Sequence, residues 1–331
     1  MTTTPTEIRA GRRAPAAGAA RAALGRWLDR EQVLGPLLML PALALLALFL
    51  AYPFVLGISL SLSDAAIGRS VSHFVGLKNF VADWRSDLFR LTFKNTVVYT
   101  GVATGFKLAL GLALALLLNQ AFRGKKIVRA GVLLPWIVPT VLSALAWLWI
   151  FDSTYSVLNW ALRRMTDWFL VGGLLTVVLH MPANRGFNWL GDGALAMGSV
   201  IAVNTWRGVP FFAISLLAGL QTIDLELYEA AAIDGASAPQ RFLHVTLPLL
   251  RPVLLIVVLF SVVWTFSDFQ VVYVLTRGGP ANSTHLLATL AYQVGLQGAQ
   301  LGQGASISLA MFPVLAVVTA AVLAYLRRED A

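Results

Sequence analysis

The sequence contains no cysteine and very little charge. Without a thiol, its 331 residues can form no disulfide bond, no thiolate metal site and no cysteine nucleophile. Charged residues make up only 12% of the chain, whereas hydrophobic residues make up 58%. Ordinary soluble domains carry about 25% charged residues, so a water-soluble globular protein is excluded. The composition therefore indicates an all-α integral membrane protein that crosses the bilayer several times.

Other absences narrow the function. No glycine-rich loop followed by Lys-Ser or Lys-Thr is present, so the chain has no ATP site and we expect no cofactor in it. The net charge of +9 forms no basic stripe interleaved with aromatic residues, which argues against nucleic acid as a partner. Histidines are few and lack the paired spacing of a metal site, so no metal is expected. They are His73, His180, His244 and His285.

Six apolar segments are long enough to cross the membrane. A hydrocarbon core about 30 Å thick requires about 20 helical residues. Prolines inside the first and third segments should kink these helices rather than end them. We expect transmembrane helices at residues 34–62, 96–118, 130–150, 194–220, 249–275 and 307–326. The apolar piece at residues 168–179 is too short to span, and a hairpin, interfacial helix or packed cap is expected there; a seventh span would reverse the topology that follows.

The distribution of basic residues sets the expected orientation. Six spans place both termini on one side, and that side carries 13 basic residues. The opposite side carries 9 over a longer total length. Because cytoplasmic segments are enriched in Lys and Arg, we expect both termini to be cytoplasmic. Residues 1–32, which contain six arginines, then form a basic cytoplasmic tail.

A polar segment separates the fourth and fifth apolar runs and lies on the cytoplasmic side of this topology. Thr222 or Asp224 can cap a helix at its start. Gly235 permits a turn that a β-carbon would strain, and Pro239 suits the first turn of a second short helix. We expect this second helix to end at Pro248, where it joins the fifth span.

The same segment resembles the EAA motif of the permease subunits of ABC importers, E-A-A-x3-G-x9-I-x-L-P. Its residues here are Glu229, Ala230, Ala231, Gly235, Val245 in place of isoleucine, Leu247 and Pro248. The wider string LYEAAAIDGASAPQRF is similar to the carbohydrate branch of this superfamily. That branch usually has Ile-Pro before the helix, where this chain has Ile223 and Asp224.

Three outlying segments resemble the same carbohydrate branch. They are residues 74–80 (FVGLKNF), Asn188–Leu190, and residues 266–280 (FSDFQVVYVLTRGGP). The resemblance covers about residues 34–326. Residues 167–186 fit the pattern poorly and look like an insertion.

The resemblance implies a type I ABC importer permease in the bacterial cytoplasmic (inner) membrane. Its implied partners are a second permease, two ATP-binding cassette subunits that hold ATP and Mg, and an extracytoplasmic solute-binding protein. The implied solute is a sugar, oligosaccharide, polyol or glycerol phosphate. The expected divisions are a tail at 1–32, a first helix and external segment at 33–94, a permease core at 95–326 with its EAA loop at 222–248, and a cytoplasmic end at 327–331.

The resemblance also implies roles for individual residues. The loop residues implied to couple the spans to the ATPase are Glu229, Ala230, Ala231, Asp234 and Gly235. For Glu229 the alternative is a solvated helix face held by Arg241. The glycine-rich segment after the fifth span is expected either to form a simple turn or to contact the binding protein or the solute outside. Its residues are Gly278, Gly279 and Pro280.

Charged side chains inside the spans are costly and usually face a cavity or a partner. Arg207, beside Asn204, lies in the fourth span and Asp268 in the fifth. We expect them to line a polar solute pathway, or alternatively to form a structural ion pair or gate contact. Lys107 could instead extend toward the membrane surface. Aromatic rings in the fifth span could stack on sugar rings; they belong to Trp264, Phe266 and Tyr273.

Three other functions remain as alternatives. A secondary transporter or channel would not need an ATPase partner, but it leaves the Glu229 motif unexplained. An integral-membrane enzyme would need clustered His, Asp or Ser side chains near one interface, and the sequence shows no such cluster. A permease for phosphate or amino acids would share the motif but not the outlying segments.

Overall fold

The structure, a computed structural model, describes residues 31–166 and 187–329. The chain divides into two compact units, residues 1–57 and 58–331, which are described separately. All but the last two residues of the predicted tail at 1–32 lie outside the described residues, as does the predicted insertion at 167–186 with the apolar piece at 168–179. Five described helices are long and apolar enough to cross a membrane, or six if a bent pair counts as one.

The first unit contains α2 (Glu31–Leu46), a π-helical turn (Ala47–Ala51) and the start of α3 (Tyr52–Ser61). Together they make the continuous apolar helix expected for the first span, Gly35–Ser61. In the π-helical turn the Tyr52 N–H donates to Ala47 O, five residues back. The next residue is Pro53, which lacks an N–H and whose ring would clash with a carbonyl four residues back, so the wider turn accommodates it.

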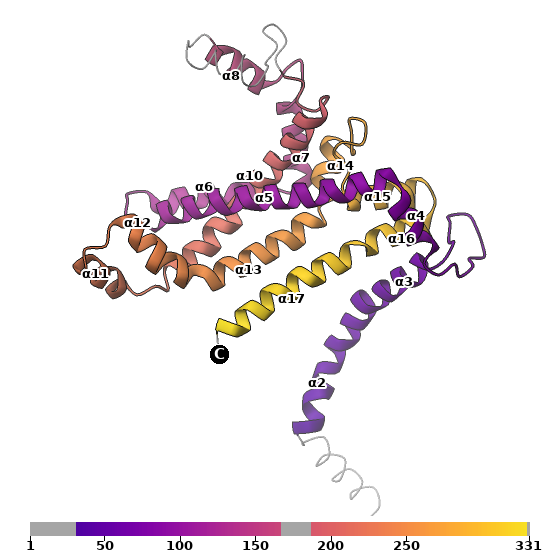
Figure 1. Ribbon diagram of the computed structural model, residues 1–331, viewed down its shortest axis with the longest axis horizontal. Coiled ribbons are helices and arrows are strands. Elements are labelled where there is room, and N and C mark those ends of the chain that lie inside the picture. The colour runs from indigo at the N-terminus through magenta and orange to yellow at the C-terminus, as the bar shows by residue number, and fades with distance from the viewer. Residues whose placement is uncertain (1–30, 167–186, 330–331) are drawn as a thin grey trace, which may run out of the picture. The chain divides into compact units, whose positions relative to one another are not determined.

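The core of the second unit is the pair α5 (Asp87–Asn119) and α10 (Gly193–Leu220), which pack along each other (Figure 1). Both helices are longer than the predicted spans at 96–118 and 194–220, α10 by a single residue. Asp192 caps α10, since its carboxylate accepts the N–H groups of Ala194 and Leu195, both at 3.0 Å. The buried positions on α5 recur every three or four residues, which places them on the face toward α10. They include Tyr99, Ala103, Lys107, Gly111 and Ala115.

Two glycines allow α5 and α10 to approach closely. A β-carbon at Gly111 would overlap the Phe212 side chain, and one at Gly208 would overlap Cδ of Lys107 and lie 3.1 Å from its Cγ. Gly208 therefore makes the space in which the Lys107 side chain lies between the two helices. Gly198, also on α10, has nothing within 4 Å of a β-carbon.

The third predicted span is not one straight helix. Helices α6 (Lys125–Ile137) and α7 (Thr140–Ile150) meet at an angle of 92°. Val138 is extended between them, with φ −65° and ψ 130°. A residue before proline is disfavoured in the helical region, so Pro139 causes the break. The expected kink at 130–150 is thus a sharp bend, after which Thr140, the first residue of α7, lies within hydrogen-bond distance of Arg207 on α10.

The helix of the fifth predicted span, residues 249–275, begins and ends at other residues in the structure. One continuous helix runs from Ala238 to Phe266 through α12 (Ala238–Arg241), a π-helical turn (Phe242–Thr246) and α13 (Leu247–Phe266). The predicted helix end at Pro248 is therefore wrong. Leu247 N–H donates to Phe242 O, and the wide turn accommodates the following proline, as in the first span.

After Phe266 the helix breaks, and α14 (Gln270–Leu275) leaves in a new direction to pack on α7. The chain returns through α15 (Leu287–Tyr292) and a π-helical turn (Gln293–Gln297). The last span is α16 (Leu301–Leu309) followed by α17 (Met311–Glu329), so it begins earlier than the predicted 307.

Two further short helices belong to the described part of the second unit. They are α4 (Lys78–Arg85) and α8 (Val157–Thr166). On α4 the Asp83 carboxylate is buried and accepts hydrogen bonds from Ser306 Oγ (2.6 Å) and Gln303 Nε2 (3.0 Å), which joins α4 to α16. Burial raises the pKa of Asp83 above its ordinary value.

Candidate functional site

The polar loop forms a helix, a turn and a second helix, as predicted. Helix α11 (Leu225–Ile233) ends in a Schellman motif, in which Ala236 N–H donates to Ala231 O (2.9 Å) and Gly235 N–H to Ala232 O (3.1 Å). Gly235 has φ +80°, a left-handed conformation that favours glycine. The spacing between the alanines and the glycine is therefore the spacing that this helix end requires.

The predicted helix start is only partly correct. Asp224 occupies the N-cap position, but its side chain makes no capping hydrogen bond. Thr222 Oγ1 instead donates to Gly219 O, at the end of α10. Pro239 lies in the first turn of α12, as expected.

The predicted coupling residues lie on the surface of α11 and its turn. Glu229, Ala230, Asp234 and Gly235 are exposed, and Ala231 is half-buried. Among the described residues Glu229 forms no ion pair with Arg241, so the predicted alternative partner does not hold it. Ile233 on the same helix is 87% exposed.

One hydrogen bond fastens α11 to the span that follows. Tyr228 Oη lies 3.0 Å from Oγ1 of Thr246, which is buried in the π-helical turn at the start of the long helix. The contact joins α11 to the base of the fifth span by a side chain as well as by the connecting turn.

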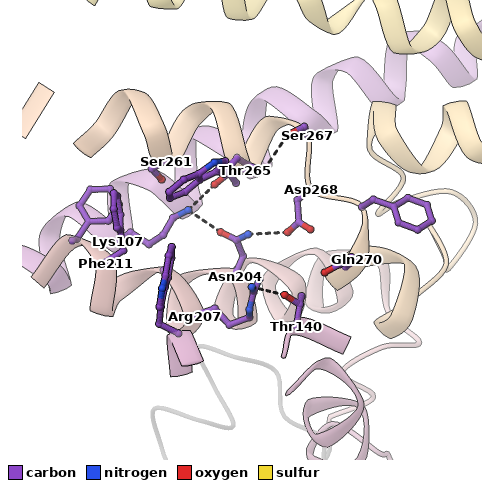
Figure 2. A pocket seen from close by; sticks show the side chains of 15 residues that line it. Lys107, Thr140, Asn204, Arg207, Phe211, Ser261, Thr265, Ser267, Asp268 and Gln270 are labelled. Carbon is purple, nitrogen blue, oxygen red and sulfur yellow. Dashed lines mark hydrogen bonds between the residues drawn. The ribbon is translucent and has the colours of Figure 1, made fainter. Parts of the chain in front are cut away.

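The charged residues predicted inside the membrane surround one cavity of about 460 Å³ (Figure 2). Arg207, Asn204, Trp264 and Asp268, four of the five residues of the predicted pathway, line this cavity. The other lining residues come from α5, α6, α7, α10, α13, the break after α13 and the first residue of α14. They are Lys107, Trp136, Thr140, Gly208, Phe211, Phe212, Ser261, Thr265, Ser267, Phe269 and Gln270.

A chain of hydrogen bonds crosses the cavity wall and joins three helices. Lys107 Nζ donates to Asn204 Oδ1 (2.9 Å) and Thr265 Oγ1 (2.7 Å). Asn204 Nδ2 donates to Asp268 Oδ2 (2.8 Å), which also accepts from Tyr99 Oη (2.7 Å). The expectation that Lys107 extends to the membrane surface is wrong, because its side chain is buried among these partners, with the residue 4% exposed.

Arg207 lies apart from this chain of bonds. Its Nη2 donates to Thr140 Oγ1 (2.6 Å), at the first residue of α7. Its Nε is buried and has no hydrogen-bond partner among the described residues. The two ion pairs of the described chain do not include Arg207 with Asp268, so the alternative of a direct structural pair is not what the structure shows.

Aromatic rings form one side of the cavity, and only one of the three predicted rings belongs to it. Trp264 is 49% exposed and packs on Phe211 (centroids 5.1 Å apart) and Trp136 (5.8 Å). Phe266 is buried in the hydrophobic core. Tyr273 does not line the cavity; it stacks on Phe269 at 4.8 Å and contacts Tyr292.

The glycine-rich segment after α14 is a tightly bonded loop. Thr284 Oγ1 lies 2.7 Å from Thr276 Oγ1 and donates to Gly279 O (2.6 Å). Gly278 is buried, with φ +90°, and a β-carbon there would overlap the ring of His285. Burial lowers the pKa of His285 below its ordinary value.

Residues 107–329, more than half of the chain, match the family described as "Binding-protein-dependent transport system inner membrane component". The chain belongs to this family. It is 35% identical to the trehalose/maltose transport system permease protein MalF of Thermococcus litoralis over 86% of this chain and 90% of that protein. It is 32% identical to the sulfoquinovosyl glycerol transport system permease protein SmoG of Agrobacterium fabrum over 92% of this chain and 94% of that protein.

A solved structure confirms the predicted fold of this permease. The chain superposes on the crystal structure of a bacterial ABC transporter involved in import of the acidic polysaccharide alginate with a TM-score of 0.74 at 23% identity. The match covers 92% of this chain and 99% of the other. The permease is therefore a multi-pass inner-membrane subunit, with the type I fold, of an ATP-driven importer that depends on a binding protein. It is the permease subunit of a transport system.

Sequence reasoning missed several residues of the permease cavity. Thr140 and Trp136 flank the break before α7. A proline within a span, with polar and aromatic residues beside it, is a sequence signal that points to these two residues. Lys107 has a small residue at the fourth position on either side, Ala103 and Gly111, a pattern that marks a helix face in close contact with another helix. Within the described ranges no three His, Asp or Glu side chains gather as a metal site would require.

Proposed function

We propose that this permease forms half of the translocation pathway of an importer for a sugar, oligosaccharide, polyol or glycerol phosphate. In this proposal it assembles with a second permease and two ATP-binding cassette subunits. The observation that carries the proposal is a single helix, Ala238–Phe266, that links the exposed Glu229 loop to the cavity. Its 29 residues make it about 43 Å long.

The coupling mechanism follows from this helix. Packed helices move as rigid units, so a displacement of α11 is transmitted along the helix to Ser261, Trp264 and Thr265 in the cavity wall. The Tyr228 to Thr246 hydrogen bond keeps α11 in register with the helix base. We propose that Glu229, Ala230, Ala231, Asp234 and Gly235 contact a cassette subunit, so that closure of the cassettes on ATP moves the cavity wall.

The solute pathway is the cavity lined by Asn204, Arg207, Trp264 and Asp268. Exposed tryptophan surface beside polar groups suits a sugar, whose ring faces stack on aromatic side chains while its hydroxyls form hydrogen bonds. Support for the carbohydrate class comes from the relatives named for trehalose, maltose and sulfoquinovosyl glycerol. Trp136 and Trp264 remain exposed in this chain alone, and we propose that the second permease covers them.

Both termini and the Glu229 loop are cytoplasmic in this proposal, and the segment with Gly278, Gly279 and Pro280 faces the binding protein. Because Gly278 is buried, the loop would present its exposed neighbours, Ala281 and Asn282. The glycine then shapes the loop and the neighbouring residues make the contact.

An amino-acid or phosphate permease is the second candidate, and it differs from the first only in the class of solute.

The test uses two glycines that have the same left-handed backbone conformation. Gly235 and Gly124 have φ values of +80° and +82°, and a β-carbon on either would have nothing within 4 Å. Valine at either position costs about 1–2 kcal/mol in backbone strain, but only Gly235 lies in the proposed coupling loop. The assay is ATP hydrolysis stimulated by solute-loaded binding protein, with the complete importer in proteoliposomes.

We expect Gly235→Val to abolish most of the stimulation while Gly124→Val keeps it, with both variants inserted in the membrane. Gly235→Asn should retain more activity than Gly235→Val, because asparagine tolerates the left-handed conformation. Tyr228→Phe and Thr246→Val should each lower stimulation, and together no further than either alone. Equal stimulation in the two valine variants would contradict the coupling role.

A further inference from the structure

Two cationic side chains and one carboxylate line the cavity, and the carboxylate already accepts hydrogen bonds from neighbouring side chains. Asp268 Oδ2 accepts hydrogen bonds from Tyr99 and Asn204, and through Asn204 it is joined to Lys107. Lys107 in turn has two oxygen acceptors at 2.7 and 2.9 Å. These two charges therefore neutralise each other within one bonded group.

The remaining cation is Arg207. A guanidinium has five N–H donors, and the structure shows one of them bonded, to Thr140 Oγ1. Its Nε is buried and has no partner among the described residues. An ionised side chain inside a membrane span costs several kcal/mol unless it is paired or hydrated, so the half-buried Arg207 requires either water or a negatively charged group in the cavity beside it.

The surroundings of Arg207 also favour an anion. Thr140 is the first residue of α7, an eleven-residue helix, so the positive end of that helix dipole lies at the cavity. Thr140 Oγ1 accepts the hydrogen bond from Arg207, which leaves its own hydrogen available to donate. In Figure 2 the Arg207 and Thr140 pair lies on the opposite side of Asn204 from Lys107.

We propose that Arg207 and Thr140 form an anion-recognition subsite, and that the solute of this permease carries a carboxylate, sulfonate or phosphate group. The solute class is then an acidic sugar or a phosphorylated polyol rather than a neutral saccharide. The guanidinium fork binds two oxyanion oxygens at once, while Trp264 and Phe211 contact the ring that carries the acid. This inference rests on the proposed function, because it requires the cavity to be the solute pathway.

The experiment compares matched neutral and acidic solutes. The complete importer, with its second permease, cassettes and binding protein, is reconstituted in proteoliposomes, and uptake of radiolabelled probes is measured. The pairs are cellobiose with cellobiouronic acid, and glycerol with glycerol 3-phosphate. We expect an acidic member to be taken up at least tenfold faster than its neutral counterpart at equal concentration.

Variants connect that preference to Arg207. Arg207→Gln should lower acidic uptake at least tenfold, and Arg207→Lys should retain part of it, because lysine keeps the charge but loses the fork. Thr140→Val should weaken acidic uptake less. The control is Arg90→Gln, an exposed arginine on α5 outside the cavity. Pull-down of the cassette subunits checks that each variant assembles.

The outcomes separate the inference from the proposed function. ATP-driven uptake of a neutral probe in preference to its acidic partner would overturn the inference and leave the proposed function standing; Arg207 would then be paired with a carboxylate of the second permease. Undiminished acidic uptake by Arg207→Gln would also overturn it. Absence of solute-stimulated ATP hydrolysis with all four probes would reject both proposals for this class.

Discussion

Replacing Gly208 with alanine should disrupt the polar network at the centre of the molecule. The new methyl group would overlap Cδ of Lys107, so the lysine side chain must leave its position between α5 and α10. It would then lose its hydrogen bonds to Asn204 and Thr265. Hydrogen bonds to a charged group contribute about 1.5–3 kcal/mol each, so the loss is about 3–6 kcal/mol if neither bond re-forms.

The matched control is Gly198→Ala on the same helix, where a β-carbon meets nothing within 4 Å. That change should stabilise by about 1 kcal/mol, because alanine has the higher helix propensity. The assay is the free energy of unfolding of the purified permease in mixed micelles, followed by tryptophan fluorescence. Gly208→Ala should therefore lower stability while Gly198→Ala raises it.

A double-mutant cycle tests the cause. Lys107→Ala removes the atoms that the new methyl group would overlap, so in that background Gly208→Ala should cost little, and the coupling free energy should exceed about 1 kcal/mol. Additive effects of the two changes would refute the reasoning. So would a stabilising Gly208→Ala, since that would show that the lysine moves aside at no cost.

Two further predictions concern the ends of helices. Burial raises the Asp83 pKa above its ordinary value of 3.8, so the folded state binds the proton more tightly than the unfolded state does. Stability should fall as pH rises through the window above 3.8, and Asp83→Asn should flatten that fall in a pH series of thermal unfolding; an unchanged slope would contradict the assignment. Asp192→Ala should lower the free energy of unfolding by about 1–2 kcal/mol, because the α10 cap is lost. Asp192→Asn should lower it less, as measured by chemical unfolding. Equal losses in the two variants would exclude a capping role.

The location of the spans could be predicted from the composition, but the ends of several spans could not. Apolar length alone placed a helix over residues 194–220, and the structure has it at Gly193–Leu220. The same criterion ran through Ser267–Phe269, because a three-residue break changes the average hydropathy very little. Prolines were equally ambiguous. The chain breaks at Pro139, whereas Pro53 and Pro248 lie in continuous helices just after a π-helical turn, and Pro41, Pro135, Pro210 and Pro252 lie inside α-helices without one.

The candidate site was predictable where a residue was unusual in its own segment. Arg207 and Asp268 stood out because charge is rare in apolar helices, and both line the cavity. Tyr273, predicted as a stacking surface of the pathway, does not line the cavity, because the break at Ser267–Phe269 turns α14 away from α13. Lys107 was misplaced because its partners, Asn204 and Thr265, lie 97 and 158 residues away in the sequence; the small residues around Lys107 mark a contact face but do not identify those partners.

The π-helical turn at Phe242–Thr246 fixes an angular relation between the two ends of the long helix. A π-helical turn contains one residue more than an α-helical turn, and each residue of an α-helix corresponds to about 100° of rotation. The side chains of α12 are therefore rotated by about one residue step relative to the helix that carries Ser261, Trp264 and Thr265. Deletion of one residue here would convert the turn to an α-helical one and leave the Glu229 loop at nearly the same angle around the helix axis, whereas straightening the turn with all its residues kept would rotate the loop by about 100°.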